Sequence, residues 1–352
     1  MKVLSEMQAA VRSLSKILPQ GNKTYPGLLS APADTSMLPT ANLNGIVTYD
    51  PSEFLITALA GTPLHTLVSA LAEQGQYLPF DPLWGERGST IGGAIAGGVS
   101  GPRQLLYGSL RDFVMEVQLI DGLGELVRGG GKVVKNSAGF DLPKLMVGSY
   151  GRLGVLTEVT LKVLPAPETY LGLRVECSSF DDAMQCVRAL RSEPLPIASL
   201  EIGQDAFLDC EFAGLSSALV AVTERAKTLL SGRDTSQGNG KAALDRGAEH
   251  GKNLLRVAAS PATIADFADD LASDLSESDS FRLSAGGTLV WVWQDSERAD
   301  ESLDQLLQKY RYSAIELSNC REELLALGDL EWRSHARLVQ KAMDPEGKFL
   351  AF

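Results

Sequence analysis

Residues 85–101 read GERGSTIGGAIAGGVSG, and this glycine-rich stretch decides how the fold is interpreted. Glycine lacks a Cβ and adopts positive φ at little cost, so such a backbone can approach a ligand closely and direct N–H groups at a phosphate. The small residues between the glycines of this stretch favour a short helix or tight turn. A flexible linker would be polar, whereas this stretch carries Ile91, Ile95 and Val99. We therefore predict a phosphate-binding loop.

The composition limits the class of protein. A length of 352 residues predicts two domains, and a net charge of −12 argues against nucleic-acid binding. No apolar run reaches the roughly 18–20 residues of a membrane span, and Met1–Gln20 lacks the features of a secretion signal. We expect a cytoplasmic protein, with any membrane association peripheral to the inner face and made through a partner.

Cysteine and histidine spacing indicates no metal site. No two cysteines form a C-x-x-C pair, so we expect free thiols in a reducing compartment rather than an iron–sulfur cluster or zinc site. The histidines also lack metal-ligand spacing, and we interpret them as surface or structural residues. These residues are Cys177, Cys186, Cys210, Cys320, His65, His250 and His335.

The first part of the chain alternates short elements with polar loops. We interpret residues 28–44 as irregular, and Pro165-Ala166-Pro167 as a domain boundary. We predict a helix that begins at Pro63, ends at Gly75 and carries an apolar face of Leu64, Leu67, Val68 and Leu71. The other predicted helices are 5–16 and 142–147, and the predicted strands are 46–49, 54–58, 113–120, 124–128 and 155–164.

Beyond residue 168 the pattern β-α-β-β-α is repeated. This order predicts a two-layer α+β domain built of ferredoxin-like halves. We interpret residues 231–251 as a mobile loop. Predicted strands are 171–177, 198–202, 206–212, 254–258, 281–284, 288–293 and 313–317, and predicted helices are 180–191, 218–230, 263–275, 299–310 and 326–342.

Three glycine-bearing loops, at 19–27, 84–101 and 148–154, are separated by these elements. None is a G-x-G-x-x-G between a strand and a helix, as a Rossmann site requires. The chain also lacks the G-x-x-x-x-G-K-[ST] of a P-loop. We infer that phosphates are held by several separate loops.

Five blocks in their order and spacing carry a family resemblance: 78–82, 90–103, 107–114, 134–142 and 145–158. With them the chain resembles the vanillyl-alcohol-oxidase, or PCMH-type, FAD-binding flavoproteins, and among these the smaller FAD-binding subunits of bacterial glycolate oxidase (glycolate dehydrogenase). The resemblance spans about residues 10–167. It implies a two-subdomain PCMH-type FAD-binding domain, followed by the ferredoxin-like α+β cap domain.

The resemblance also implies a set of FAD-binding residues. Lys23 and Arg103 would balance the diphosphate, although Lys23 could equally be a solvated loop lysine. Tyr107 either packs on the flavin or is an ordinary half-buried tyrosine. The implied cofactor-binding residues are Gln20, Gly21, Asn22, Lys23, Thr24, Pro79, Asp81, Ser89, Thr90, Gly92, Gly93, Gly97, Gly98, Ser100, Gly101, Tyr107, Gly151, Leu153, Gly154, Val155 and Leu156.

Two departures from the family pattern matter. The first loop has Asn22 and Lys23 where covalent members carry a histidine, so we expect non-covalent FAD. The H-x-G-D-G-N-x-H motif of catalytic 2-hydroxy-acid oxidases is absent. Arg333 and Arg337 beside His335 could in principle supply a cation and a base, but we favour a helix with a polar face there. No catalytic residue is assigned.

The sequence therefore predicts an FAD-dependent oxidoreductase subunit. Residues 1–167 would bind FAD, residues 168–330 would form a cap or partner-binding domain, and residues 331–352 would return to the FAD domain. The chain would relay electrons or assist assembly beside a larger catalytic flavoprotein subunit that oxidises glycolate to glyoxylate and an iron–sulfur subunit. The alternatives are a self-sufficient FAD oxidoreductase acting on another 2-hydroxy acid or alcohol, and a flavin-free structural subunit.

Overall fold

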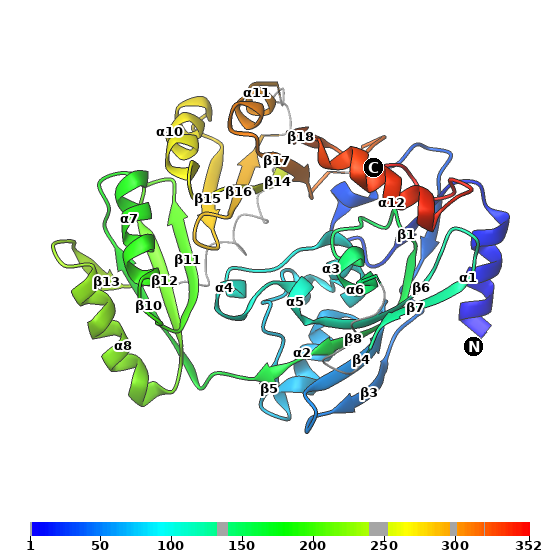
Figure 1. The fold of residues 1–352 in the computed structure, drawn as a ribbon, viewed down its shortest axis with the longest axis horizontal. Coiled ribbons are helices and arrows are strands. Elements are labelled where there is room, and N and C mark those ends of the chain that lie inside the picture. Colours follow the sequence, from blue (N-terminus) through cyan, green and yellow to red (C-terminus); the bar gives the residue numbers. More distant parts are fainter. Residues whose placement is uncertain (1, 132–139, 239–252, 296–300, 320) are drawn as a thin grey trace.

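A computed structural model describes residues 2–131, 140–238, 253–295, 301–319 and 321–352. It contains a five-stranded sheet from the first part of the chain and a nine-stranded sheet from the second. Figure 1 shows the two sheets in separate halves of the molecule, with the last helix lying back on the first half. The predicted α+β fold is confirmed.

The five-stranded sheet is antiparallel throughout. Its strand order is β3 (Ile46–Asp50), β4 (Leu55–Leu59), β8 (Val155–Lys162), β6 (Val114–Ile120) and β7 (Leu126–Gly130). The helices packed with it are α2 (Leu64–Ala72), α3 (Ile91–Gly97), α5 (Leu110–Phe113) and α6 (Leu142–Met146). Leu64, Leu67 and Leu71 of α2 are fully buried and join Ile56 and Val117 of the sheet in one core. This apolar stripe is the one that predicted the helix.

Residues 28–44, predicted as irregular, contain a second strand. After α1 (Lys2–Ser13), strand β1 (Ile17–Gln20) pairs in parallel with β2 (Ser36–Pro39). A 3₁₀ turn, η1 (Pro26–Leu29), lies between them. Only Leu38 of β2 is buried, so the strand shows no apolar alternation. The pairing with β1 determines its conformation.

The nine-stranded sheet consists of two ferredoxin-like halves joined side by side, as predicted. The first half has the order β13-β10-β12-β11 and the second β15-β16-β14-β17, with β18 added at the far edge. β11 pairs with β15 at Ile202↔Leu283, which joins the halves. The strands are β10 (Thr169–Val175), β11 (Ile197–Gly203), β12 (Leu208–Gly214), β13 (Thr235–Gln237), β14 (Asn253–Ala258), β15 (Ser280–Ser284), β16 (Leu289–Gln294), β17 (Ser313–Glu316) and β18 (Ala326–Gly328).

Four helices cover the face of this sheet that points away from the first half of the molecule (Figure 1). Their apolar residues and the outward strand residues form one core, which includes Phe180, Phe267 and Val292. The opposite face is turned toward the first half of the molecule. These helices are α7 (Phe180–Arg191), α8 (Ser216–Leu229), α10 (Ile264–Asp274) and α11 (Glu301–Tyr310).

Two predictions in this region are wrong in part. Residues 326–328 were predicted as helix but form β18, which extends the sheet by pairing with β17. Helix α12 therefore begins at Trp332 and runs to Met343. The predicted loop 231–251 contains β13, which adds to the edge of β10, and residues 239–251 lie outside the described part. Three-residue strands are too short for periodicity to reveal.

The C-terminal segment is bonded to the first half of the molecule. Gln340 of α12 donates from Nε2 to the carbonyl oxygens of Arg152, at 2.9 Å, and Leu350, at 2.7 Å. The Ile17 N–H donates to the carbonyl oxygen of Lys348 at 2.8 Å. Where the structure describes the chain, none of its helices is both long and apolar enough to cross a membrane.

Candidate functional site

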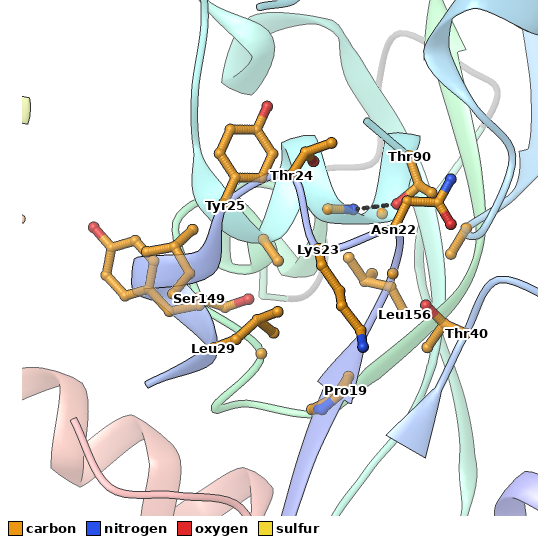
Figure 2. Close-up of a pocket in the computed structure, with 18 of the residues that line it drawn as sticks. Pro19, Asn22, Lys23, Thr24, Tyr25, Leu29, Thr40, Thr90, Ser149 and Leu156 are labelled. Atoms are coloured by element: carbon orange, nitrogen blue, oxygen red, sulfur yellow. Dashed lines mark hydrogen bonds between the residues drawn. The ribbon is translucent and has the colours of Figure 1, made fainter. Parts of the chain in front are cut away.

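The three glycine-bearing loops meet around one cavity in the first half of the molecule (Figure 2). Its empty volume is about 670 Å³, including space open to solvent. The lining combines glycine backbone with apolar side chains, including Leu28, Leu29 and Leu156. The other lining residues are Pro19, Gly21, Asn22, Lys23, Thr24, Tyr25, Thr40, Ala60, Thr90, Gly92, Gly93, Ala96, Ser149, Tyr150, Gly151 and Gly154.

The first loop supplies unused N–H groups to this cavity. Among the described residues, the N–H groups of residues 21–24 donate no hydrogen bond to the protein. Lys23 adopts φ 60°, and a left-handed residue in a tight loop turns successive N–H groups into a concave anion site. Figure 2 shows the Lys23 side chain among the lining residues, with its ammonium drawn toward Pro19 and Thr40. This loop can therefore hold an anion with backbone donors and one cation.

The second loop forms a short helix, as predicted, but the N–H groups of the first turn of this helix are not free for a ligand. The N–H groups of Ile91 and Gly92 donate to the carbonyl oxygens of Thr62 and Ala60, at 2.9 and 2.7 Å. Gly93 donates to Oγ1 of Thr90 at 3.1 Å. The prediction that this stretch directs several N–H groups at a phosphate is therefore wrong for the first turn of α3, because the protein itself satisfies them.

The glycines of the second loop instead permit close packing. A Cβ on Gly92 would lie 2.7 Å from the carbonyl oxygen of Ala60. A Cβ on Gly21 would lie 2.7 Å from Oγ1 of Thr90, which caps α3. Asn22 donates from Nδ2 to the carbonyl oxygen of Gly88 at 2.8 Å. The first and second loops thus touch directly; a side chain at position 21 would separate them, and one at position 92 would push α3 away from Ala60.

The third loop closes the cavity and holds one unpartnered hydroxyl group. The N–H groups of Gly148 and Tyr150 donate to the carbonyl oxygens of Ile95 and Ala96, at 2.9 and 2.8 Å. Between them Ser149 lines the cavity, and its buried Oγ has no hydrogen-bond partner among the described residues. A buried hydroxyl without a partner is costly, so a ligand in this cavity is its natural partner.

Arg152 connects the third loop to the C-terminal segment. Its guanidinium is buried and donates to the carbonyl oxygens of Tyr150, at 2.9 Å, and Ala351, at 3.1 Å. Burial lowers the pKa of Arg152 to about 10, and the nearby Arg333 acts in the same direction. The cavity wall therefore depends on residues more than 150 positions apart in the chain.

The structure divides the predicted cofactor-binding residues into two sets. Those that line the cavity are Gly21, Asn22, Lys23, Thr24, Thr90, Gly92, Gly93, Gly151, Gly154 and Leu156. Those outside its lining are Gln20, Pro79, Asp81, Ser89, Gly97, Gly98, Ser100, Gly101, Tyr107, Leu153 and Val155. The side chains of Ser89, Leu153 and Val155 are buried, and Oγ of Ser100 accepts from the Leu110 N–H at 2.9 Å. The Tyr107 side chain is exposed.

Sequence reasoning missed several lining residues. Ser149 and Tyr150 lie in the third glycine-bearing loop, so their position was a usable signal. Tyr25 lies within the first loop, directly after residues 20–24, and its buried hydroxyl accepts from Oγ of Ser89 at 3.2 Å. Thr40 follows β2, and nothing in its sequence context indicated that this strand would bring it to the cavity.

Arg103 does not lie at the cavity, contrary to its predicted role beside a diphosphate. Its guanidinium forms two hydrogen bonds, of 2.7 and 2.9 Å, with the carboxylate of Glu211 on β12. It also lies 3.6 Å above the centre of the Tyr170 ring. Both partners belong to the nine-stranded sheet, so Arg103 joins the two halves of the molecule.

Besides Glu211, a second buried carboxyl group lies between the two halves of the molecule, on the inner face of β11. Sequence reasoning did not identify it. Glu201 is fully buried, and its Oε1 accepts from Ser284 Oγ at 2.7 Å and the Ala285 N–H at 3.3 Å. Oε2 has no hydrogen-bond partner in the described part of the chain. Burial raises the pKa of Glu201 to about 7.

The inner face of the second sheet packs directly against the glycine-rich stretch. Arg256 of β14 donates from Nη1 to the carbonyl oxygens of Gly97, at 3.2 Å, and Gly98, at 2.8 Å. Trp291 and Trp293 of β16 are buried in one cluster with Val99. The end of this stretch is therefore covered by an arginine and two indole rings.

His335, Arg333 and Arg337, which the sequence offered as a base and cations, do not line the cavity. His65 and His335 are exposed. Arg333 donates to the carbonyl oxygen of Leu324 at 3.2 Å, and Arg337 to that of Phe352 at 3.0 Å. The preferred interpretation of 332–340 as a helix is confirmed. His250, Cys320 and residues 134–139 of the resemblance block lie outside the described residues.

The cavity suits an anionic ligand with an apolar ring. The free N–H groups of the first loop and Lys23 match a diphosphate. Leu28, Leu29 and Leu156 offer an apolar wall, and Ser149 an unused hydroxyl. FAD has both chemical features, so the residues present fit this cofactor.

The comparison with known families agrees with this fit. Residues 2–130 match the family model described as FAD binding domain. The chain is 43% identical over 198 residues to the glycolate oxidase subunit GlcE of Escherichia coli, covering 56% of each chain. It is 35% identical over 160 residues to the glycolate oxidase subunit GlcD of Bacillus subtilis, covering 46% of this chain and 34% of that protein.

The matches thus span about half or less of the length of these relatives. Among solved structures, alkyldihydroxyacetonephosphate synthase aligns over 98% of this chain and 73% of its own, with a TM-score of 0.69 and 16% identity. This likeness concerns the fold alone. The predicted resemblance is confirmed: the first part of the chain carries an FAD-binding domain, and FAD is the cofactor it implies.

Proposed function

We propose that this chain is the FAD-binding subunit of a glycolate oxidase, an enzyme that oxidises glycolate to glyoxylate. Residues 1–167 form the FAD-binding domain, residues 168–330 the cap or partner-binding domain, and residues 331–352 the segment that returns to the FAD domain. The observation that carries the proposal is the cavity between the three glycine-bearing loops, with its free N–H groups and the unpartnered Ser149 hydroxyl.

FAD, when bound, supplies a ring that accepts and donates electrons. In our proposal the N–H groups of residues 21–24 and the Lys23 ammonium hold the diphosphate. Ser149 donates its hydroxyl hydrogen to the cofactor. Gly92 and Gly93 keep α3 close to the cavity, and Arg256 fixes the backbone at Gly97 and Gly98. The binding is non-covalent.

The charges between the two halves of the molecule favour electron relay over substrate oxidation. A hydroxy acid needs a cation for its carboxylate and a base for its hydroxyl proton. Arg103 is bonded to Glu211, and Arg256 to backbone carbonyl groups. Both arginines already have protein partners, and Trp291 and Trp293 fill the adjoining space. This supports a relay or assembly role.

In the proposed complex the larger catalytic flavoprotein subunit oxidises glycolate. The E. coli and B. subtilis relatives carry the names of two different glycolate oxidase subunits, which supports a multi-subunit enzyme. An iron–sulfur subunit then accepts the electrons. The complex is cytoplasmic, and any contact with the inner face of the membrane is made through the partners.

Glu201 favours a second candidate function, a self-sufficient FAD oxidoreductase acting on another 2-hydroxy acid. A buried carboxyl group with a pKa of about 7 suits a general base. Against this candidate, Oε1 of Glu201 already accepts hydrogen bonds from Ser284 and the Ala285 N–H, so the relay remains our preferred function.

The test begins with the absorption spectrum of the purified full chain. We expect flavin bands, and a colourless protein that still binds its partners would support a flavin-free structural subunit instead. Glycolate and D-lactate are then added without oxygen, first to this chain and then together with the larger subunit. The relay is supported if the isolated chain does not bleach and the mixture loses more flavin absorbance than the larger subunit loses alone. Rapid bleaching of the isolated chain would refute it and favour the self-sufficient enzyme.

A further inference from the structure

Two cysteine side chains lie against each other in the second half of the molecule, and neither lines the FAD cavity. The Sγ atoms of Cys177 and Cys186 are 3.8 Å apart. Cys186 lies on α7, and Cys177 lies in the connection 176–179 that joins β10 to this helix. A disulfide bond requires the two sulfurs to approach to roughly 2.0 Å, and Cys177, outside regular structure, lies where a small backbone shift costs least.

The two thiols differ in their access to solvent. Cys186 is fully buried, whereas Cys177 is half-buried. A surface depression is lined by the residues on both sides of Cys177 and by the turn at 232–234. A small reagent therefore reaches Cys177 first, and Cys186 stands behind it as the second thiol.

Charges next to the pair stabilise one thiolate. The thiol of Cys177 hydrogen-bonds to Cys186, which lowers the pKa of Cys186, and the positive charge of Arg233 acts in the same direction. The same hydrogen bond raises the pKa of Cys177. Arg233 is held by two hydrogen bonds, of 2.6 and 3.1 Å, to Asp182 on α7, whose negative charge opposes this effect. When the pair loses a proton, the hydrogen bond therefore favours the thiolate on Cys186 and the thiol on Cys177.

Among the described residues, the pair has no further metal ligands around it. In the described ranges, no group of three or more His, Cys, Asp or Glu side chains is arranged to hold a metal ion. Cys210 provides a contrast within the same domain. Its thiol is buried, donates to the carbonyl oxygen of Leu173 at 3.3 Å, and has its pKa raised to about 12 by burial. A thiol of this kind is unreactive.

We propose that Cys177 and Cys186 are a redox-active dithiol, which a small hydroperoxide oxidises to an intramolecular disulfide. Cys177 passes its proton to Cys186, and its thiolate attacks a peroxide oxygen. The O–O bond breaks and leaves a sulfenic acid on Cys177, with hydroxide released. The Cys186 sulfur then attacks the Cys177 sulfur, the S–O bond breaks, and water leaves with the Cys186 proton. Two thiols lose two electrons and the peroxide gains them.

The test uses the full chain with bound FAD. The protein is treated with an equimolar amount of hydrogen peroxide, its remaining thiols are alkylated, and its peptides are identified by mass spectrometry. We expect a peptide pair linked through Cys177 and Cys186, a loss of two hydrogen atoms from the intact mass, and full reversal by a thiol reductant. The linked pair should persist in the Cys210→Ser control.

A second variant identifies the thiol attacked first. In Cys186→Ser the sulfenic acid has no second thiol to react with, so dimedone should label Cys177. The proposal is overturned if wild-type Cys177 stays alkylated while Cys210 is oxidised, or if Cys177 is oxidised to sulfinic acid with no linked pair. Because the wild-type experiment decides alone, the proposal remains testable even if a variant fails to fold.

Discussion

Replacing Glu201 with glutamine tests the buried carboxyl group between the two halves of the molecule. The ordinary pKa of a glutamate side chain is 4.5, and burial raises that of Glu201 to about 7. The folded state therefore favours the protonated form. Its contribution to the free energy of unfolding is fully present below pH 4.5 and is lost as the pH rises through about 7.

The magnitude follows from the two pKa values. At about 1.4 kcal/mol per pH unit, the difference between 4.5 and about 7 corresponds to roughly 3 kcal/mol. Of this, about 2 kcal/mol is lost between roughly pH 5.5 and pH 8.5. Glutamine stays neutral throughout, so the stability of Glu201→Gln relative to wild type should rise by about 2 kcal/mol over this interval.

The assay is urea unfolding of the full chain, followed by circular dichroism at both pH values. Glu277→Gln is the matched control, because Glu277 is an exposed glutamate in the same half of the molecule. Its stability relative to wild type should not change with pH. If Glu201→Gln and wild type lost stability in parallel as the pH rises, the reasoning about this buried group would be refuted.

Three further predictions concern the cavity and the contact between the halves. Gly21→Ala should weaken FAD binding about fivefold in a flavin fluorescence titration, because the new Cβ displaces the Thr90 side chain that caps α3, a cap worth about 1 kcal/mol. Unchanged affinity would contradict the close contact between Gly21 and Thr90. Ser149→Ala should also weaken FAD binding about fivefold yet should not destabilise the FAD-free protein, since its Oγ has no partner among the described residues and is costly to bury; equal affinity would show that FAD does not use this hydroxyl. Arg103→Met should destabilise the protein by about 3 kcal/mol in urea unfolding, because Glu211 is left buried without its partner; a loss under about 1 kcal/mol would argue against this pair.

Much of the fold was predictable because its elements have strong local patterns. The apolar spacing at Leu64, Leu67 and Leu71 indicated α2, and the repeated element order indicated the two ferredoxin-like halves. The short strands β2, β13 and β18 were not predictable. Each has three or four residues and takes its conformation from a neighbouring strand, so local sequence carries almost no signal for it.

At the site, too, some features were predictable from the sequence and others were decided by the tertiary structure. The glycine content of residues 85–101 indicated a phosphate-binding loop, and the family resemblance carried by five blocks of sequence indicated FAD. Which N–H groups remain free was decided only by the tertiary structure. Ala60 and Thr62 satisfy the first turn of α3, whereas nothing in the described chain satisfies residues 21–24. A hydrogen bond depends on which distant carbonyl group folding brings within about 3 Å of an N–H, and a single sequence does not record that proximity.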